Sequence, residues 1–280
     1  MVETTAQAPL IERIEEIAQG VQERRRKKAR RSLITLWTIR VASLLLVLTA
    51  WQIYGSHTLK IIFVPFTSVI QAGVDLFVNQ NFGEAVLYSI ETFLTGMVIG
   101  GTLGIAVGML IGWSRKAEAA IGIYIYALYA TPMVSLVPLI TLWFGFELTS
   151  QLIIIVLFVF FPVVVTVYNG VTHVDPSLLD VGRVFGASQL QMWRHIVLPA
   201  VVPFIMTGMT QAVAMGLVGM FISEIFTALT GIGAVLETQA NAYHTAPTLA
   251  TILVIMVLGV AFRYLVSVLQ KRLAPWFSEA

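Results

Sequence analysis

Length, composition and charge place this chain among membrane proteins. Its 280 residues are 58% hydrophobic and only 11% charged, whereas soluble domains carry about 25% charged residues. The sequence contains no cysteine, which excludes disulfides, thiolate catalysis and thiolate metal sites. Repeated apolar stretches of roughly twenty residues therefore predict an all-α, polytopic membrane protein.

Residues 1–32 are polar and end in a basic run from Arg24 to Arg31. The charged part is too long for a signal peptide, and the apolar stretch after it has the length of a full span. A basic run can bind nucleic acid, but directly before a membrane helix it orients the chain and contacts anionic lipid. We interpret this segment as a cytosolic tail beside the lipid bilayer, with no nucleic-acid partner.

The rest of the chain, residues 33–280, forms a predicted transmembrane domain with six spans. A surface helix is expected on the extracytoplasmic side at Thr67–Val78, after Pro65. The spans are expected at Leu33–Tyr54, Ala85–Trp113, Ala119–Phe144, Gln151–Asn169, Ala200–Leu229 and Thr248–Leu269. With this arrangement every lysine and arginine except Lys60 falls on or near the side of the basic tail. The positive-inside rule then predicts that both termini are cytosolic.

The second and third spans carry unusual glycines and prolines. Glycine recurs every four residues in the second span, at positions 96, 100, 104, 108 and 112. Such a face lets a neighbouring backbone approach closely, and helix packing within the subunit is favoured over a substrate-lining role. In the third span Pro132 and Pro138 bracket Met133–Val137. The two alternatives there are a structural kink and a broken helix that borders a transport path, with Met133 and Ser135 as path candidates.

The loop between the fourth and fifth spans is amphipathic and is predicted to lie at the membrane surface. It covers Gly170–Leu198 and ends at Pro199. Asp175 and Pro176 are suited to start a short helix, and Gly186 can adopt the left-handed conformation that ends it. Ser188 can cap a second short helix, Gln189 to Val197, and Pro199 is expected to bend the chain into the fifth span. From periodicity alone, this segment is equally consistent with a connecting loop resting on headgroups.

Glu224 is an isolated carboxylate near the outer end of the fifth span. An ionisable group at this depth is costly unless it faces water, a partner or the interior of the bundle. The alternatives are a gate or path residue and a hydrogen-bonded structural carboxylate. Glu91 and Arg263 are further charges inside predicted spans, and Arg263 is close enough to the cytosolic end to snorkel.

Sequence motifs for catalysis are absent. The sequence has no phosphate-binding loop that ends in Gly-Lys-Ser/Thr and no Gly-x-Ser-x-Gly elbow, so the chain is not expected to be an enzyme or to hydrolyse ATP unaided. Its four histidines are scattered, without the helical pairing of a metal site.

The loop also carries a recognisable pattern. Gly186, Ile196 and the pair Leu198-Pro199 resemble the cytoplasmic signature of permeases in ABC importers, Glu-Ala-Ala-x3-Gly-x9-Ile-x-Leu-Pro. The first triplet here is Asp180-Val181-Gly182, which keeps the acidic residue and lacks the two alanines. The chain resembles the nitrate/sulfonate/taurine branch of that family over about three-quarters of its length. Besides the loop, the segments that carry this resemblance are Ser89–Gly112, Thr131–Gly145 and Val174–Leu179.

The resemblance implies a type I importer fold and a complex in the bacterial inner membrane. Two permease subunits, typically identical, form the pore; two ATPases bind ATP and magnesium and dock on the loop; and an extracytoplasmic binding protein delivers the solute. The loop residues that would carry the coupling are Asp180, Gly182, Gly186, Ala187, Ser188, Ile196, Leu198 and Pro199. No cofactor is expected on this chain. The implied cargo is a small organic or inorganic anion, such as a sulfonate, taurine, nitrate or an aromatic acid.

Two alternatives belong to other classes. An ion-gradient-driven secondary transporter would use carboxylates such as Glu224 and Glu91 as coupling sites, but the sequence has no sign of paired inverted repeats. An intramembrane enzyme or lipid-binding scaffold would need a catalytic constellation at membrane depth, and none is visible.

Overall fold

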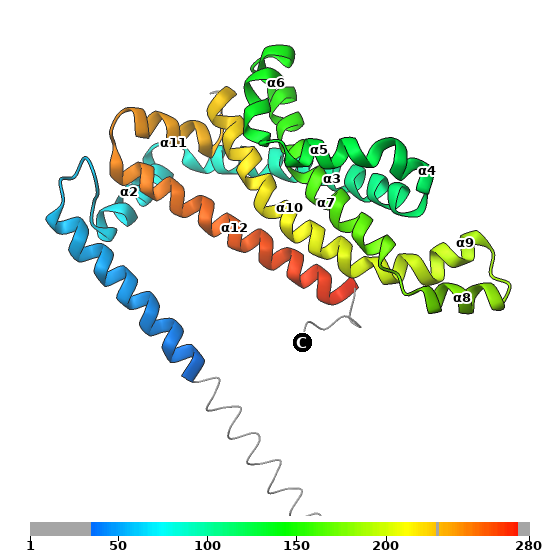
Figure 1. Ribbon diagram of the computed structural model, residues 1–280. Coiled ribbons are helices and arrows are strands. Elements are labelled where there is room, and N and C mark those ends of the chain that lie inside the picture. The colour runs from blue at the N-terminus through cyan, green and yellow to red at the C-terminus, as the bar shows by residue number, and fades with distance from the viewer. Residues whose placement is uncertain (1–34, 228–229, 274–280) are drawn as a thin grey trace, which may run out of the picture. The chain divides into compact units, whose positions relative to one another are not determined.

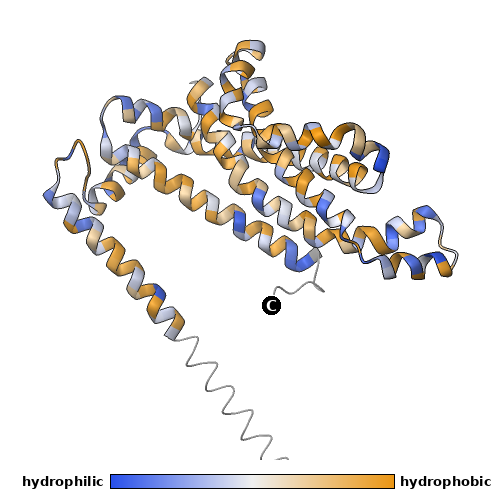
Figure 2. Ribbon diagram, in the orientation of Figure 1, coloured by the Kyte–Doolittle hydropathy of each residue, from blue (hydrophilic) through white to orange (hydrophobic). Residues whose placement is uncertain are grey.

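The computed structural model describes residues 35–227 and 230–273 (Figure 1). All regular elements within these residues are helical, and Figure 2 shows that the long helices are mainly hydrophobic. Within the described residues, five helices are long and apolar enough to cross a membrane, or up to six if one bent pair counts as a single span. The predicted all-α polytopic fold is confirmed. The basic tail, residues 1–32, lies outside the described residues.

The chain divides into two compact units, residues 1–67 and 68–280. In the first unit a helix spans Thr35–His57, against an expected end at Tyr54. The chain after it returns onto its last turns, where the indole N–H of Trp51 donates to the carbonyl oxygen of Val64 at 3.1 Å. A Cβ at Gly55 would lie 2.5 Å from the backbone carbon of Val64, so this close return requires glycine at position 55.

The expected surface helix and second span both form. Helix α2 spans Phe66–Asn79, and α3 spans Phe82–Trp113, starting before the predicted Ala85. Asn81, in the turn between them, has a φ of 53°, a left-handed conformation that asparagine adopts more readily than most residues.

The glycine face of α3 packs on α7, which spans Leu148–Thr172. A Cβ on Gly100 would lie 2.8 Å from the carbonyl oxygen of Val156, and a Cβ on Gly104 would lie 2.8 Å from the Cβ of Val163. The pattern continues at Gly108, where a Cβ would lie 2.8 Å from the carbonyl oxygen of Val164. The prediction that this face packs against a helix of the same subunit is therefore confirmed.

The third expected span, Ala119–Phe144, is broken. A short helix α4, Arg115–Ala117, leads through a π-helical turn, Glu118–Gly122, into α5, Ile123–Ala130. After a break the chain continues through a 3₁₀ turn, Met133–Leu136, into α6, Val137–Phe144, at an angle of 94° to the first part. Pro132 causes the break because it disfavours helix at Thr131, whose backbone is extended.

The loop after α7 contains the two predicted short helices, but their connection to the next span differs from the prediction. Helix α8 spans Pro176–Val184; α9, Gln189–Met192, continues through a π turn, Trp193–Val197, into α10, Leu198–Thr227. The chain does not bend at Pro199, because proline fits the first turn of a helix and the wider π turn precedes it.

Helix α7 lies between α3 and α10 and forms the centre of the second unit. Three of its valines, Val159, Val163 and Val167, are fully buried in the main core cluster. Helix α11, Ile232–Asn241, and α12, Thr245–Leu273, complete the unit. The α8–α9 segment projects at one end of α7 and α10, whereas α11 lies at the opposite end (Figure 1).

Candidate functional site

We call the segment Asp175–Pro199 the elbow. Local hydrogen bonds fix both ends of its first helix, α8. The Asp175 carboxylate caps α8 by accepting from the Ser177 backbone N–H at 2.8 Å, which lowers the pKa of that carboxyl. Gly186 has a φ of +70°, and the N–H of Ala187 donates to the Gly182 carbonyl at 2.9 Å. The predicted left-handed helix end is therefore present, as a Schellman motif.

The second half of the elbow begins with a capping box. The Ser188 hydroxyl accepts from the Gln191 backbone N–H at 3.4 Å, while the Gln191 side-chain oxygen accepts from the Ser188 N–H at 2.8 Å. Because both groups at the start of α9 are satisfied within the segment, the geometry of the turn does not depend on a partner.

The two arms of the elbow contact each other at Gly182. This glycine is buried, and a Cβ there would lie 2.8 Å from the Cδ1 of Ile196 and still nearer to Met192. The sequence pattern of the family has alanine at this position, and the glycine lets α8 approach the π turn more closely. Ile196 thus joins the elbow to the hydrophobic core, and Leu198 and Pro199 follow in the first turn of α10.

The outer face of the elbow is apolar and unpaired. Val184 and Phe185 are 86% and 85% exposed. We call the exposed set the elbow patch; it consists of Leu178, Val181, Val184, Phe185 and Leu190. Asp180 lies on the same helix and forms an exposed ion pair with Arg183 at 2.7 Å. Exposed apolar side chains clustered in one short segment, with a polar pair on the same helix, have the character of a protein-docking surface.

Glu224 is completely buried and fully hydrogen-bonded at the opposite end of α10. One carboxylate oxygen accepts from the Ser89 hydroxyl at 2.6 Å, and the other accepts from the Gly233 backbone N–H at 2.7 Å. The Ser89 oxygen in turn accepts from the Ile232 N–H at 2.9 Å. We call these four residues the clamp: they join α3 and α10 to the start of α11. This geometry fits the structural alternative for Glu224 better than the gate.

A second buried polar chain lies beside the clamp. The Tyr88 hydroxyl donates to the Gln151 side-chain oxygen at 2.8 Å, and the Gln151 amide donates to the Thr227 hydroxyl at 2.6 Å. These three side chains connect α3, α7 and α10. Together with the clamp they hold the ends of three long helices in one arrangement.

Ser89→Ala is expected to destabilise this end of the bundle. The substitution leaves the buried Ile232 N–H without an acceptor and removes one of the two donors to Glu224, which costs about 1–3 kcal/mol. The thermal midpoint of the purified protein in detergent should fall. Ser56→Ala is the matched control, because Ser56 donates only to a carbonyl within its own helix and is exposed. An unchanged midpoint in Ser89→Ala would contradict the clamp.

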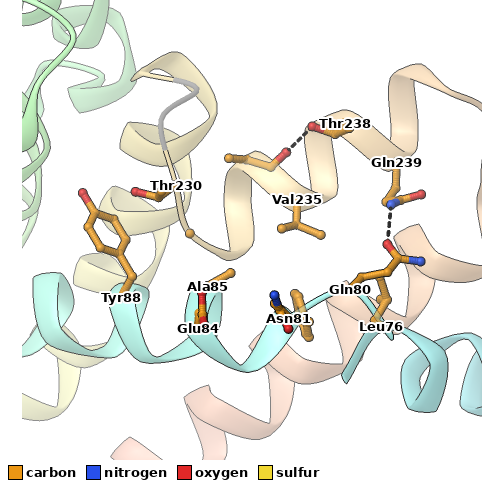
Figure 3. A pocket seen from close by; sticks show the side chains of 13 residues that line it. Leu76, Gln80, Asn81, Glu84, Ala85, Tyr88, Thr230, Val235, Thr238 and Gln239 are labelled. Atoms are coloured by element: carbon orange, nitrogen blue, oxygen red, sulfur yellow. Dashed lines mark hydrogen bonds between the residues drawn. The ribbon is translucent and has the colours of Figure 1, made fainter. Parts of the chain in front are cut away.

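An open cleft of about 600 Å³ lies between the start of α3 and the start of α11 (Figure 3). The Gln239 amide donates to the Gln80 side-chain oxygen across it at 3.4 Å. Its lining also includes Tyr88, which belongs to the second polar chain, and Gly231, which precedes the clamp residue Ile232. Its lining includes the carboxylate of Glu84 and no lysine or arginine, so it does not have the charge of an anion site.

A second, apolar cleft of about 360 Å³ lies where the broken third span meets α7 and α10. Met133, predicted as a path residue, lines it together with Tyr129, Pro162 and Met215. Ser135, the other candidate at the break, does not line this cleft, and its hydroxyl donates to the Pro132 carbonyl at 2.7 Å. Glu224 does not line it either. The predicted path residues therefore lie at two places: Met133 and Ser135 share the turn at the break of the third span, and Glu224 lies apart from them in the clamp.

Comparison with known proteins identifies the family. Residues 100–275 match the family model described as binding-protein-dependent transport system inner membrane component, which is more than half of the chain and includes the whole elbow. The chain belongs to this family. It is a multi-pass permease subunit of an ABC importer.

Similar proteins carry the same type of description. The permease is 27% identical over 233 residues to a putative aliphatic sulfonates transport permease protein, SsuC, of Bacillus subtilis, covering 82% of this chain and 84% of the relative. It is 26% identical to the taurine transport system permease protein TauC of Escherichia coli, covering 91% of this chain and 95% of the relative. A probable ABC transporter permease protein of Brucella abortus is 30% identical, with coverages of 76% and 85%.

The fold is shared with a solved structure. A crystal structure of an amino acid ABC transporter with histidines matches with a TM-score of 0.58 at 18% identity, covering 68% of the permease and 93% of that chain. At this identity the match supports the expected importer fold alone.

Sequence reasoning identified the elbow residues and Glu224 but missed the other buried polar side chains of the clamp and of the second polar chain. Ser89, Gln151 and Thr227 are buried polar residues in otherwise apolar helices. Their polar side chains were the signal that could have identified them, because a polar side chain in an apolar membrane helix needs a hydrogen-bond partner. Which residues pair was not visible, since Ser89 and Glu224 lie 135 positions apart.

Proposed function

We propose that the permease forms a solute path that is driven by a separate ATPase docked on the elbow. The elbow patch carries this proposal: its apolar side chains are exposed although the segment is locally well ordered by its caps. In this proposal the ATPase, not the permease, binds ATP and magnesium. Asp180, Gly182, Gly186, Ala187 and Ser188 would set the shape of the docking surface.

Charge placement supports the orientation that docking requires. Three pairs of basic residues lie at helix ends that the positive-inside rule assigns to the cytosol. They are Arg115 and Lys116, Arg183 and Arg194, and Lys271 and Arg272. Both termini and the elbow are therefore proposed to be cytosolic. The cleft of Figure 3 would then be extracytoplasmic, on the side where a binding protein delivers its solute.

The continuous helix from α9 to α10 supports a mechanical role for the elbow. Gln189–Thr227 passes from the docking surface to the clamp without a break, so a movement of the elbow is transmitted to α10 as a rigid body. ATP binding would close two ATPases, draw together the elbows of two permease copies and tilt their bundles. A second copy of this chain is proposed to complete the pore.

The names of the relatives support a small organic anion as cargo, of the sulfonate or taurine type. Met133 is proposed as a path residue because it lines the apolar cleft at the break of the third span. Ser135 is proposed at the same break. Glu224 is proposed to hold the outer end of α10 rather than to contact the cargo.

Reconstituted uptake tests this proposal. Liposomes that contain the permease, its ATPase and its binding protein are expected to accumulate taurine or short alkanesulfonates only with ATP and magnesium. Excess unlabelled alkanesulfonate should compete, whereas excess histidine should not. Uptake that proceeds without the ATPase, driven by an imposed proton or sodium gradient, would support the secondary transporter instead.

A further inference from the structure

One face of α10 is polar in the middle of an apolar span. Gln211 lies on this face and is exposed, as is Thr207 one turn before it. Gln211 lies about 20 Å along the helix from Leu198, at a rise of 1.5 Å per residue, which is near the middle of α10. A glutamine that faced acyl chains would leave its amide unpaired at a cost of several kcal/mol. This face of α10 therefore borders water or protein rather than lipid.

The polar face is shared with α7. The Thr166 hydroxyl lies 3.4 Å from the Gln211 side-chain oxygen, and its closer bond, at 2.7 Å, is to the Pro162 carbonyl. The two helices approach closely here because a Cβ on Gly208 would lie 3.2 Å from the Cβ of Thr166. Among the residues that the structure describes, Gln211 donates no hydrogen bond through its amide nitrogen. Its two N–H groups are available to a ligand.

The same face continues into the apolar cleft. Met215 and Val218 lie one and two turns after Gln211 and line the cleft, as does Pro162 one turn before Thr166. The remaining walls come from the broken third span, with Tyr129 and Met133. The lining contains no charged side chain. A neutral donor therefore lies one helical turn from a residue that lines an apolar space.

We propose that Gln211, whose side-chain oxygen lies beside the Thr166 hydroxyl, is a specificity-determining subsite that binds the oxygen atoms of the transported anion through its amide N–H groups, while the apolar cleft takes the carbon chain of the anion. This inference rests on the proposed function and adds the contact site to it. Sulfonate oxygens accept hydrogen bonds from an amide. A neutral donor binds more weakly than a buried cation would, which suits a site that must release its ligand.

Gln211→Leu, which removes the donor and keeps the size of the side chain, tests the subsite. In the reconstituted complex, ATP-dependent uptake of an alkanesulfonate should fall at least tenfold, while assembly with the ATPase stays intact. In Gln211→Glu, uptake should fall at least as far, because the added negative charge repels the anion. The matched control is Thr102→Val on α3, which removes an exposed hydroxyl bonded within its own helix and should leave uptake within twofold of wild type.

Val218→Trp tests the cleft separately. Filling the cleft should reduce the uptake of longer alkanesulfonates at least fivefold more than that of taurine. Normal uptake in Gln211→Leu would overturn the proposal. Loss of the assembled complex in this variant alone would also overturn it, because Gln211 would then be a contact between subunits. Wild-type complex that transports no organic anion with ATP would overturn the proposed function itself, and the subsite with it.

Discussion

Gly104→Leu is expected to prevent α3 and α7 from packing. A Cβ at this position already lies 2.8 Å from the Cβ of Val163 and 3.0 Å from the carbonyl oxygen of Phe160. Overpacking a close-packed core costs about 1–3 kcal/mol, and the cost is expected at or above the upper end here because a backbone carbonyl cannot rotate away. The thermal midpoint in detergent should fall by about 5 °C or more, and the yield of folded protein should fall with it.

Gly83→Ala is the matched control for Gly104→Leu. Gly83 is also in α3, but a Cβ there would meet no atom within 4 Å. Because alanine favours helix over glycine by about 0.8–1.0 kcal/mol, this variant should be at least as stable as the wild type. If Gly104→Leu matched the control in midpoint and yield, the close contact between α3 and α7 would be wrong.

Phe185→Asp is expected to abolish ATP-driven uptake without unfolding the permease. Phe185 is 85% exposed, so its removal takes little from the core. If the elbow patch docks on the ATPase, the ring is a buried anchor in the complex, and such anchors contribute about 2 kcal/mol or more. Uptake should fall at least tenfold, and the ATPase should co-purify in reduced amount. The thermal midpoint of the isolated permease should stay within about 2 °C of wild type, since surface substitutions change stability by about 0.5 kcal/mol or less.

Gln189→Ala controls for general damage to the elbow. Gln189 is exposed at the start of α9 and does not belong to the elbow patch. This variant should retain uptake and co-purification. Normal uptake in Phe185→Asp would exclude the patch as the docking surface, whereas equal loss in both variants would indicate that the elbow tolerates no change.

Local patterns in the sequence were sufficient to predict most of the fold. Helix α2 and the spans α3, α7 and α12 follow from apolar length. The three helix ends of the elbow follow from Asp175, Ser188 and Gly186. The pairing of α3 with α7 was only partly visible: the glycine face indicated close packing, but not its partner.

Two features depended on geometry that composition does not carry. Pro132 indicated a break in the third span, but the 94° angle is set by how α5 and α6 pack on α7. Pro199 suggested a bend that the π turn at Trp193–Val197 makes unnecessary.

The candidate site was predictable where it is local and unpredictable where it is not. The elbow is contiguous, so its motif and caps could be read directly. The clamp joins Ser89 to Glu224 and Ile232 across more than a hundred positions, and only the fold brings these residues together. Gln211 was missed because one glutamine in an apolar span carries no motif; its exposure and the cleft beside it make it informative.

The docking of the elbow is tested most directly by site-specific cross-linking. Because the sequence contains no cysteine, Val184→Cys introduces a single thiol at the most exposed residue of the elbow patch. In assembled complex in native membranes, this thiol is expected to cross-link to the ATPase and, in right-side-out vesicles, to be protected from an impermeant maleimide. Labelling of the thiol from the outside, with no cross-link to the ATPase, would contradict the account.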